Sequence, residues 1–103
     1  MKNIKNIFDE NNWEKATNYP NGTLQKMLRD DENGNTVILK IPKGFNMAAH
    51  SHVYTEQHFV LDGSYTSDKV VYPRGSYQIY YAHEDHGPFT SKSGTLILVI
   101  WDK

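Results

Sequence analysis

Residues 44–63, GFNMAAHSHVYTEQHFVLDG, carry the clearest signal of both fold and chemistry in this chain. His50 and His52 are two residues apart, so both imidazoles lie on the same face of a β-strand. Glu56 follows after three residues, which is enough chain to turn and start an antiparallel strand. Its carboxylate can then reach an ion held by the two imidazoles. The stretch therefore predicts a metal site formed by these three side chains and a further imidazole from a distant strand.

The composition excludes several other kinds of protein. A chain of 103 residues is long enough for one domain, and we expect a single domain over residues 1–103. Its net charge of −1 gives no electrostatic reason to expect nucleic acid or a membrane as partner. The absence of cysteine excludes disulfides and thiolate ligands. Residues 1–13 contain no apolar run long enough for a signal peptide, so we expect a cytoplasmic protein.

Short runs of β-branched and aromatic residues, separated by Gly, Pro or Asn, predict an all-β sandwich or barrel. Gly63 is expected to end one strand, and the apolar run TLILVIW at residues 95–101 is expected to be a buried strand rather than an edge. A short helix is expected over residues 7–16. We expect strands over residues 24–29, 36–42, 46–52, 56–62, 65–71, 76–81, 86–90 and 95–101.

The spacing of five residues in the quoted stretch resembles the first motif of the cupins. Every fixed position of that motif is filled, by Gly44, His50, His52, Glu56 and Gly63. The first motif is specific, and the resemblance extends over residues 36–101. It implies an all-β fold, the small cupin β-barrel (a double-stranded β-helix or jelly roll), with residues 1–23 as an N-terminal arm.

The second cupin motif is present with departures. Gly75 stands at its start and His86 at its metal-binding histidine. Tyr81 replaces the motif's proline, His83 its glycine and Thr90 its asparagine, and none of these three positions is ordinarily a ligand. The resemblance therefore implies that His86 supplies the third imidazole.

The metal set implied by the resemblance is His50, His52, Glu56 and His86 around one divalent transition-metal ion. Histidine and carboxylate ligands suit Fe, Mn, Ni, Co, Cu and Zn alike, so the sequence does not choose among them. The chain is most similar to small single-domain cupins. These include relatives of the anti-sigma factor metal domain and the diketone and hydroxyacetophenone dioxygenases.

Further side chains are candidates for the site. His58 shares the strand face of Glu56, and is either a hydrogen-bonded core residue or a base that contacts substrate. Tyr81, with Tyr77 and Tyr80, is expected on a strand that crosses the barrel, where a phenol can face a bound oxygen atom. His58 and Tyr81 are our candidate catalytic residues, and His83 is a weaker candidate at the mouth of the site.

Two functions agree with these features. One is a metalloenzyme, dioxygenase-like or isomerase-like, that acts on a small oxygen-rich organic substrate. The other is a non-catalytic sensor module that binds a metal or ligand. Because exposed sheet edges tend to pair, we also expect a homodimer, with the strand over residues 24–29 as a contributor.

Overall fold

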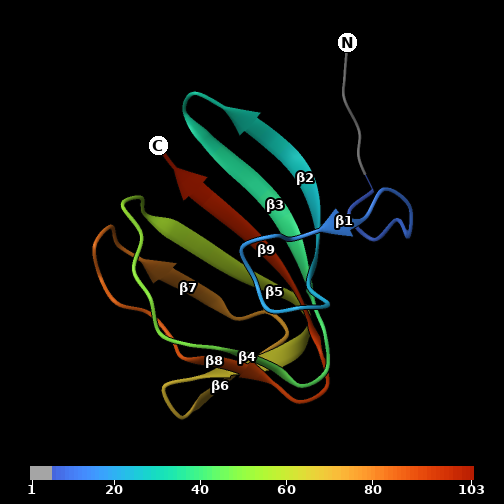
Figure 1. The fold of residues 1–103 in the computed structure, drawn as a ribbon, viewed down its shortest axis with the longest axis vertical. Helices are drawn as coiled ribbons and strands as arrows, with labels where there is room; N and C mark the ends of the chain where they lie inside the picture. Colours follow the sequence, from blue (N-terminus) through green and yellow to red (C-terminus); the bar gives the residue numbers. More distant parts are fainter. Residues whose placement is uncertain (1–5) are drawn as a thin grey trace.

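The computed structural model describes residues 6–103, and all of the regular secondary structure in that range is β-strand (Figure 1). The expected all-β architecture is confirmed. The helix expected over residues 7–16 is wrong, because turns and a two-residue strand occupy that segment. Asn12 has a positive φ of 67°, which an α-helix does not accommodate. Residues 1–5 of the expected arm lie outside the described residues. No helix in the described range could span a membrane.

The strands follow one another with short connections, and several differ in length from those expected from the sequence. Their bounds are β1 (Glu14–Lys15), β2 (Leu24–Asp31), β3 (Gly34–Ile41), β4 (Phe45–Met47), β5 (Glu56–Ser67), β6 (Val70–Pro73), β7 (Tyr77–Tyr80), β8 (Phe89–Ser91) and β9 (Thr95–Asp102).

All strand pairs are antiparallel, and the strands form one curled sheet (Figure 1). Its first half has the order β1-β2-β3-β9-β5, and β7 pairs with the first residues of β5. The last residues of β5 pair instead with β6 and β8, and β8 pairs with β4. The last strand of the chain, β9, thus lies between β3 and β5, which confirms that it is an interior strand.

The bend in β5 lets one strand serve both halves of the sheet. Gly63 does not end this strand as expected, because β5 continues to Ser67. The pairing with β9 shifts register between Val60 and Asp62, and Gly63 adopts a positive φ of 74°. A Cβ at Gly63 would stand 2.3 Å from the carbonyl oxygen of Gly94. Glycine is required here because the bent backbone passes directly against the neighbouring strand.

A tight hairpin replaces the single strand expected over residues 65–71. Asp68 and Lys69 join β5 to β6, and their φ values are 50° and 68°. Two consecutive positive φ angles are typical of a type I′ turn, whose twist matches that of the flanking strands. The pair Asp68-Lys69 lacks the glycine that normally marks this turn in a sequence. The sequence therefore predicts one continuous strand over residues 65–71 instead of a hairpin.

The inner face of the curled sheet holds the hydrophobic core. Apart from Ala16, its buried side chains come from β3, β4, β5, β8 and β9, and alternate residues of β3, β5 and β9 point inward. The buried members are Ala16, Val37, Leu39, Ile41, Phe45, Val60, Tyr65, Phe89, Ile97 and Val99.

The described residues of the N-terminal arm contact both faces of the sheet. Midway along the arm, β1 pairs with the edge of β2, and the chain on either side of β1 lies against a different face. On the outer face, the ammonium groups of Lys26 and Lys40 lie 4.7 and 5.6 Å from the ring centre of Trp13. Lys26 also donates a hydrogen bond to the carbonyl oxygen of Asp9. After β1 the chain crosses the inner side of the sheet, where Tyr19 packs against the core (Figure 1).

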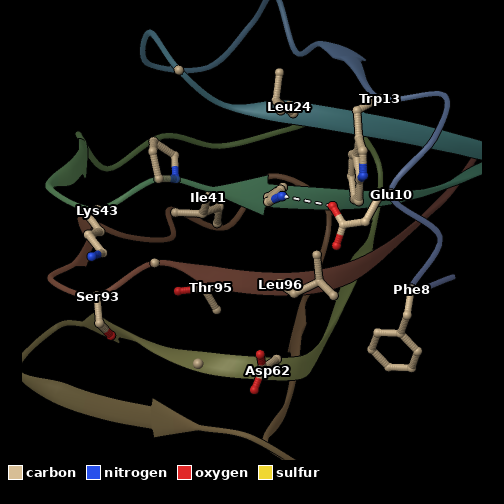
Figure 2. A pocket seen from close by; sticks show the side chains of 15 residues that line it. Phe8, Glu10, Trp13, Leu24, Ile41, Lys43, Asp62, Ser93, Thr95 and Leu96 are labelled. Atoms are coloured by element: carbon tan, nitrogen blue, oxygen red, sulfur yellow. Dashed lines mark ion pairs between the residues drawn. The ribbon is translucent and has the colours of Figure 1, made fainter.

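A groove of about 570 Å³ lies between this arm and the outer face of the sheet (Figure 2). Phe8, Trp13, Leu96 and Asp62 are among its lining residues, and Lys40 forms an ion pair of 3.7 Å with Glu10 beside it. The groove includes none of the histidines that the sequence indicates as ligands.

Candidate metal centre

The backbone places His50 directly opposite His86. β4 ends at Met47, earlier than expected, and His50 forms an isolated bridge with His86. The amide of each residue donates to the carbonyl of the other, at 2.9 Å from His50 and 2.8 Å from His86. Residues directly opposite in an antiparallel pair point their side chains to the same face. The two imidazole rings accordingly lie 4.4 Å apart between centroids.

His52 and Glu56 reach the same place from the segment that follows. The carbonyl of His52 accepts a hydrogen bond of 2.7 Å from the amide of His83, which fixes the segment against the loop before His86. Glu56 is the first residue of β5 and is 3 % exposed. Its Oε2 atom lies 3.6 Å from His52 Nε2 and 3.5 Å from His86 Nε2.

The three imidazoles have the spacing of a metal site. One nitrogen from each of His50, His52 and His86 lies within 4.8 Å of the other two. Nitrogen ligands bind a divalent ion at about 2.0–2.1 Å, so two ligands of one ion are separated by roughly 3–4 Å. A small rotation of the side chains therefore brings all three nitrogens onto one ion.

The hydrogen bonding of the site fits a cation between these side chains. His50 Nδ1 lies 3.0 Å from the carbonyl oxygen of Ala48, which can only accept, so this nitrogen carries the proton and Nε2 is left free to bind. Glu56 Oε2 is buried and has no hydrogen-bond donor among the described residues. An unpaired buried carboxylate oxygen is costly, and a bound ion would satisfy it. The donor set thus fits a divalent transition metal.

The charges of the site support the same arrangement. Burial acts to raise the pKa of Glu56, but hydrogen bonding and positive charge from His58, with contributions from His86 and His52, outweigh it and hold that pKa below its ordinary value. Burial lowers the pKa of His86 from 6.5 to about 4, against the opposing charge of Glu56. An ionised carboxylate and a neutral imidazole are the forms that bind metal ions.

Of the other candidates from the sequence, some are buried beside the metal site and others are exposed to solvent. His58 is buried, and its Nε2 lies 3.2 Å from Glu56 Oε1, so it contacts the carboxylate rather than the ring trio. Tyr81 is 59 % exposed and follows the end of β7. Tyr80 instead packs its ring 4.5 Å from that of His86. His83 is exposed, in a loop with a positive φ.

Two spaces of different size meet at the candidate centre. The first, the inner cavity, is about 30 Å³ and lies between His86, Glu56 and apolar side chains of the core such as Phe89 and Ile97. The second, the mouth groove, is about 460 Å³ and is lined by His52 together with Asn18, Met27, Tyr54, Trp101 and Lys103. An ion held by the four side chains would stand between a small space and a large one.

Tyr19 is the site residue that the sequence did not indicate. It lines both spaces, although it comes from the arm, far from either motif. Burial, with a smaller contribution from the negative charge of Glu56, raises the pKa of Tyr19 well above its ordinary value. A tyrosine in a loop of Thr, Asn, Pro and Gly gives no periodic signal, so only the folded chain shows its place.

Comparison with known proteins bears on the family and the fold of this chain. Residues 3–102 match the family model of the ChrR cupin-like domain. No curated protein matches the chain.

Solved structures share the fold at low sequence identity. An RmlC-like cupin from Shewanella frigidimarina has a TM-score of 0.76 and 21 % identity, covering 88 % of this chain and 82 % of that chain. An acetylacetone dioxygenase from Acinetobacter johnsonii has a TM-score of 0.79 and 16 % identity, and the match covers 99 % of this chain and 74 % of that chain. The complex of Rhodobacter sphaeroides SigE with the anti-sigma ChrR has a TM-score of 0.74 and 20 % identity, covering 92 % of this chain and 51 % of the matched chain. These matches identify the fold as the cupin barrel.

Proposed function

The chain belongs to the family of ChrR cupin-like domains, and we propose that it is a metalloenzyme acting on a small oxygen-rich organic substrate. In this proposal one divalent transition-metal ion is held by His50, His52, Glu56 and His86. Residues 1–103 form one cupin domain, with residues 1–23 as its arm and residues 36–101 as its core.

The observation that carries the proposal is the convergence of three imidazoles and a buried carboxylate beside an open groove. The nitrogens of His50, His52 and His86 lie within 4.8 Å of one another. His52 also lines the mouth groove, whose volume is in the range of small-molecule sites. The likeness to an acetylacetone dioxygenase supports oxygen-rich substrates of similar size.

The ion, when bound, would polarise the oxygen atoms of a substrate or activate dioxygen. The chain's own residues orient and enclose the reactants. Trp101 and Tyr54 offer aromatic surface in the mouth groove, and the amide of Asn18 offers polar contacts. His58 holds the carboxylate of Glu56, and Tyr80 packs against His86, so both act through the ligands. Tyr81 remains a candidate only at the exposed rim.

Two measurements test the enzyme proposal. Protein purified without added metal should contain close to one transition-metal ion per chain by elemental analysis. Oxygen consumption should then be followed against a panel of β-diketones and hydroxyketones, with substrate loss measured in parallel to detect isomerisation. Bound metal without turnover of any compound in the panel would contradict this form of the proposal.

A Glu56→Gln variant should bind the ion more weakly while still holding it through the three imidazoles. Loss of one charged contact in a buried site costs about 1.5–3 kcal/mol, so affinity should fall by roughly 10- to 150-fold. Competition with a chelator of known affinity measures the change. Asp62→Asn, which removes an exposed carboxylate from the same strand, is the matched control. Equal affinity in Glu56→Gln and wild type would show that this carboxylate is not a ligand.

A sensor module is the second candidate function. It is favoured by the family match and by the structural likeness to the SigE–ChrR complex, although the alignment covers only 51 % of the matched chain. In such a protein the metal would organise the barrel, and a ligand would change affinity for a partner. Ligand binding to the metal-loaded protein without turnover would favour this function over the enzyme.

The edges of the sheet support the further proposal of a homodimer. The sheet has β1, a strand of only two residues, at one edge, where it pairs with β2 at Leu24 and Gln25. An open strand edge is a template for pairing with a second copy. Light scattering at micromolar concentration should give twice the chain mass of 11.9 kDa. A mass of one chain would contradict the dimer.

A further inference from the structure

The inner cavity and the mouth groove share a wall made of three side chains, Tyr19, Met47 and His50. His50 is itself a candidate ligand, so an ion at the centre would stand in this wall and face both spaces. The two spaces differ greatly in size, at about 30 Å³ inside and about 460 Å³ outside. A ligand bound at the candidate centre would therefore have little volume available on one side and a large volume on the other.

The inner space has room for very little. A cavity needs roughly 10–15 Å³ of this volume to hold one water molecule, so about 30 Å³ accommodates two or three groups of that size. A methyl group meets this limit, and a phenyl ring exceeds it. The walls of the inner cavity are close-packed core side chains, which have little room to move. Phe89 and Tyr65, for example, are both buried, and their ring centroids lie 5.7 Å apart.

Tyr19 is held in the wall by its own loop. The amide of Ala16 donates to the carbonyl of Thr23 at 3.0 Å, and the amide of Tyr19 donates to the carbonyl of Ala16 at 3.3 Å. Thr23 donates from both its amide and its hydroxyl to the carbonyl of Pro20, at 3.2 and 2.8 Å. Ala16 and Thr23 are buried, so both ends of the loop are fixed and the tyrosine ring between them has a defined position.

We propose that the centre selects ligands that chelate through two oxygens and have at least one small end, such as methyl, and that Tyr19 enforces this selection. Such a ligand places its small end in the inner cavity and its larger end in the mouth groove. A ligand with two bulky ends has no orientation that avoids the ring of Tyr19. This inference rests on the proposed metal site and specifies the class of molecule that it binds.

Three β-diketones separate the possibilities in cobalt-loaded protein without oxygen, with binding followed by the visible absorption of the ion. Acetylacetone carries two methyl groups, benzoylacetone one methyl and one phenyl, and dibenzoylmethane two phenyls. Wild type should bind the first two, and dibenzoylmethane at least ~10-fold more weakly than benzoylacetone, as expected when a group exceeds its pocket. In Tyr19→Ala this discrimination should disappear, because the inner cavity then opens to the groove.

Three variants complete the test. Tyr19→Phe keeps the ring and should keep the discrimination. Met27→Ala, which enlarges the mouth groove without touching the inner cavity, should keep it as well. Tyr19→Leu also lacks the planar ring and should bind dibenzoylmethane more tightly than wild type does. The Tyr19→Leu variant thus tests the role of the ring even if Tyr19→Ala does not fold.

Absence of the metal site and absence of the size selection would give different results. If wild type takes up no cobalt, the proposed metal site is wrong and the inference falls with it. If cobalt binds and the ratio of affinities for benzoylacetone and dibenzoylmethane is the same in wild type and the folded Tyr19 variants, the metal site stands and the role of Tyr19 is wrong. Tight binding of dibenzoylmethane by wild type would overturn the size limit of the inner cavity.

Discussion

A His86→Ala variant is expected to bind a divalent ion about 100-fold or more weakly than wild type. Structural zinc sites with four ligands supply about 10–16 kcal/mol, so one ligand accounts for roughly 3 kcal/mol. His86 lies directly opposite His50 in the backbone bridge and is buried, so no exposed side chain can take its place. Elemental analysis after dialysis against a weak chelator measures the retained metal.

His83→Ala is the matched control for this variant. His83 lies three residues earlier in the same loop and is exposed. Its side chain is not part of the trio of His50, His52 and His86. The His83→Ala variant should therefore retain the metal content of wild type. Equal loss in both variants would show that the loop, rather than the imidazole of His86, determines binding. Retention of metal in both would remove His86 from the ligand set.

A Gly63→Ala variant is expected to lose most of the stability of the fold. The added Cβ would stand 2.3 Å from the carbonyl oxygen of Gly94 and 3.1 Å from the Cα of Thr95, both of which are backbone atoms. The clash moves β5 away from β9 at the bend, and the positive φ adds strain. We expect destabilisation of more than about 4 kcal/mol, which is exceptional for a single substitution. Denaturant unfolding followed by circular dichroism measures it.

Gly75→Ala separates the clash from the backbone strain. Gly75 has a similar positive φ of 89°, but a Cβ there would meet no atom within 4 Å. Its cost should be limited to that of an L-residue in the left-handed region, about 1–2 kcal/mol. If the two variants are destabilised equally, the close approach of Gly63 to Gly94 does not control the fold.

The closeness of His50, His52 and Glu56 could be predicted from the sequence, because only three residues separate His52 from Glu56. His50 and His52 are followed by a turn into β5, and Glu56 is the first residue of that strand. The apolar run of β9 likewise indicated an interior strand, because its inward residues are buried and its outward residues partly buried, which leaves no polar alternation. These features depend on local sequence, which a single chain displays directly.

The features that sequence analysis missed depend on contacts between distant segments. Tyr19 reaches the site only because β1 pairs with β2 and turns the arm across the barrel. Asp68 and Lys69 form a tight turn without glycine, since the pairing of β5 with β6 imposes their positive φ angles. Tyr80, rather than Tyr81, faces His86 because β7 ends at Tyr80, opposite Glu56. Each depends on a register that no local pattern encodes.

X-ray absorption at the metal edge of the loaded protein identifies the atoms that bind the ion. Three imidazoles and one carboxylate predict a first shell of nitrogen and oxygen atoms at about 2.0–2.2 Å. They also predict the outer-shell scattering of three imidazole rings. This pattern should weaken to two rings in His86→Ala and remain at three in Glu56→Gln. A spectrum without imidazole scattering, or uptake of no ion at all, would contradict a centre built by His50, His52, Glu56 and His86.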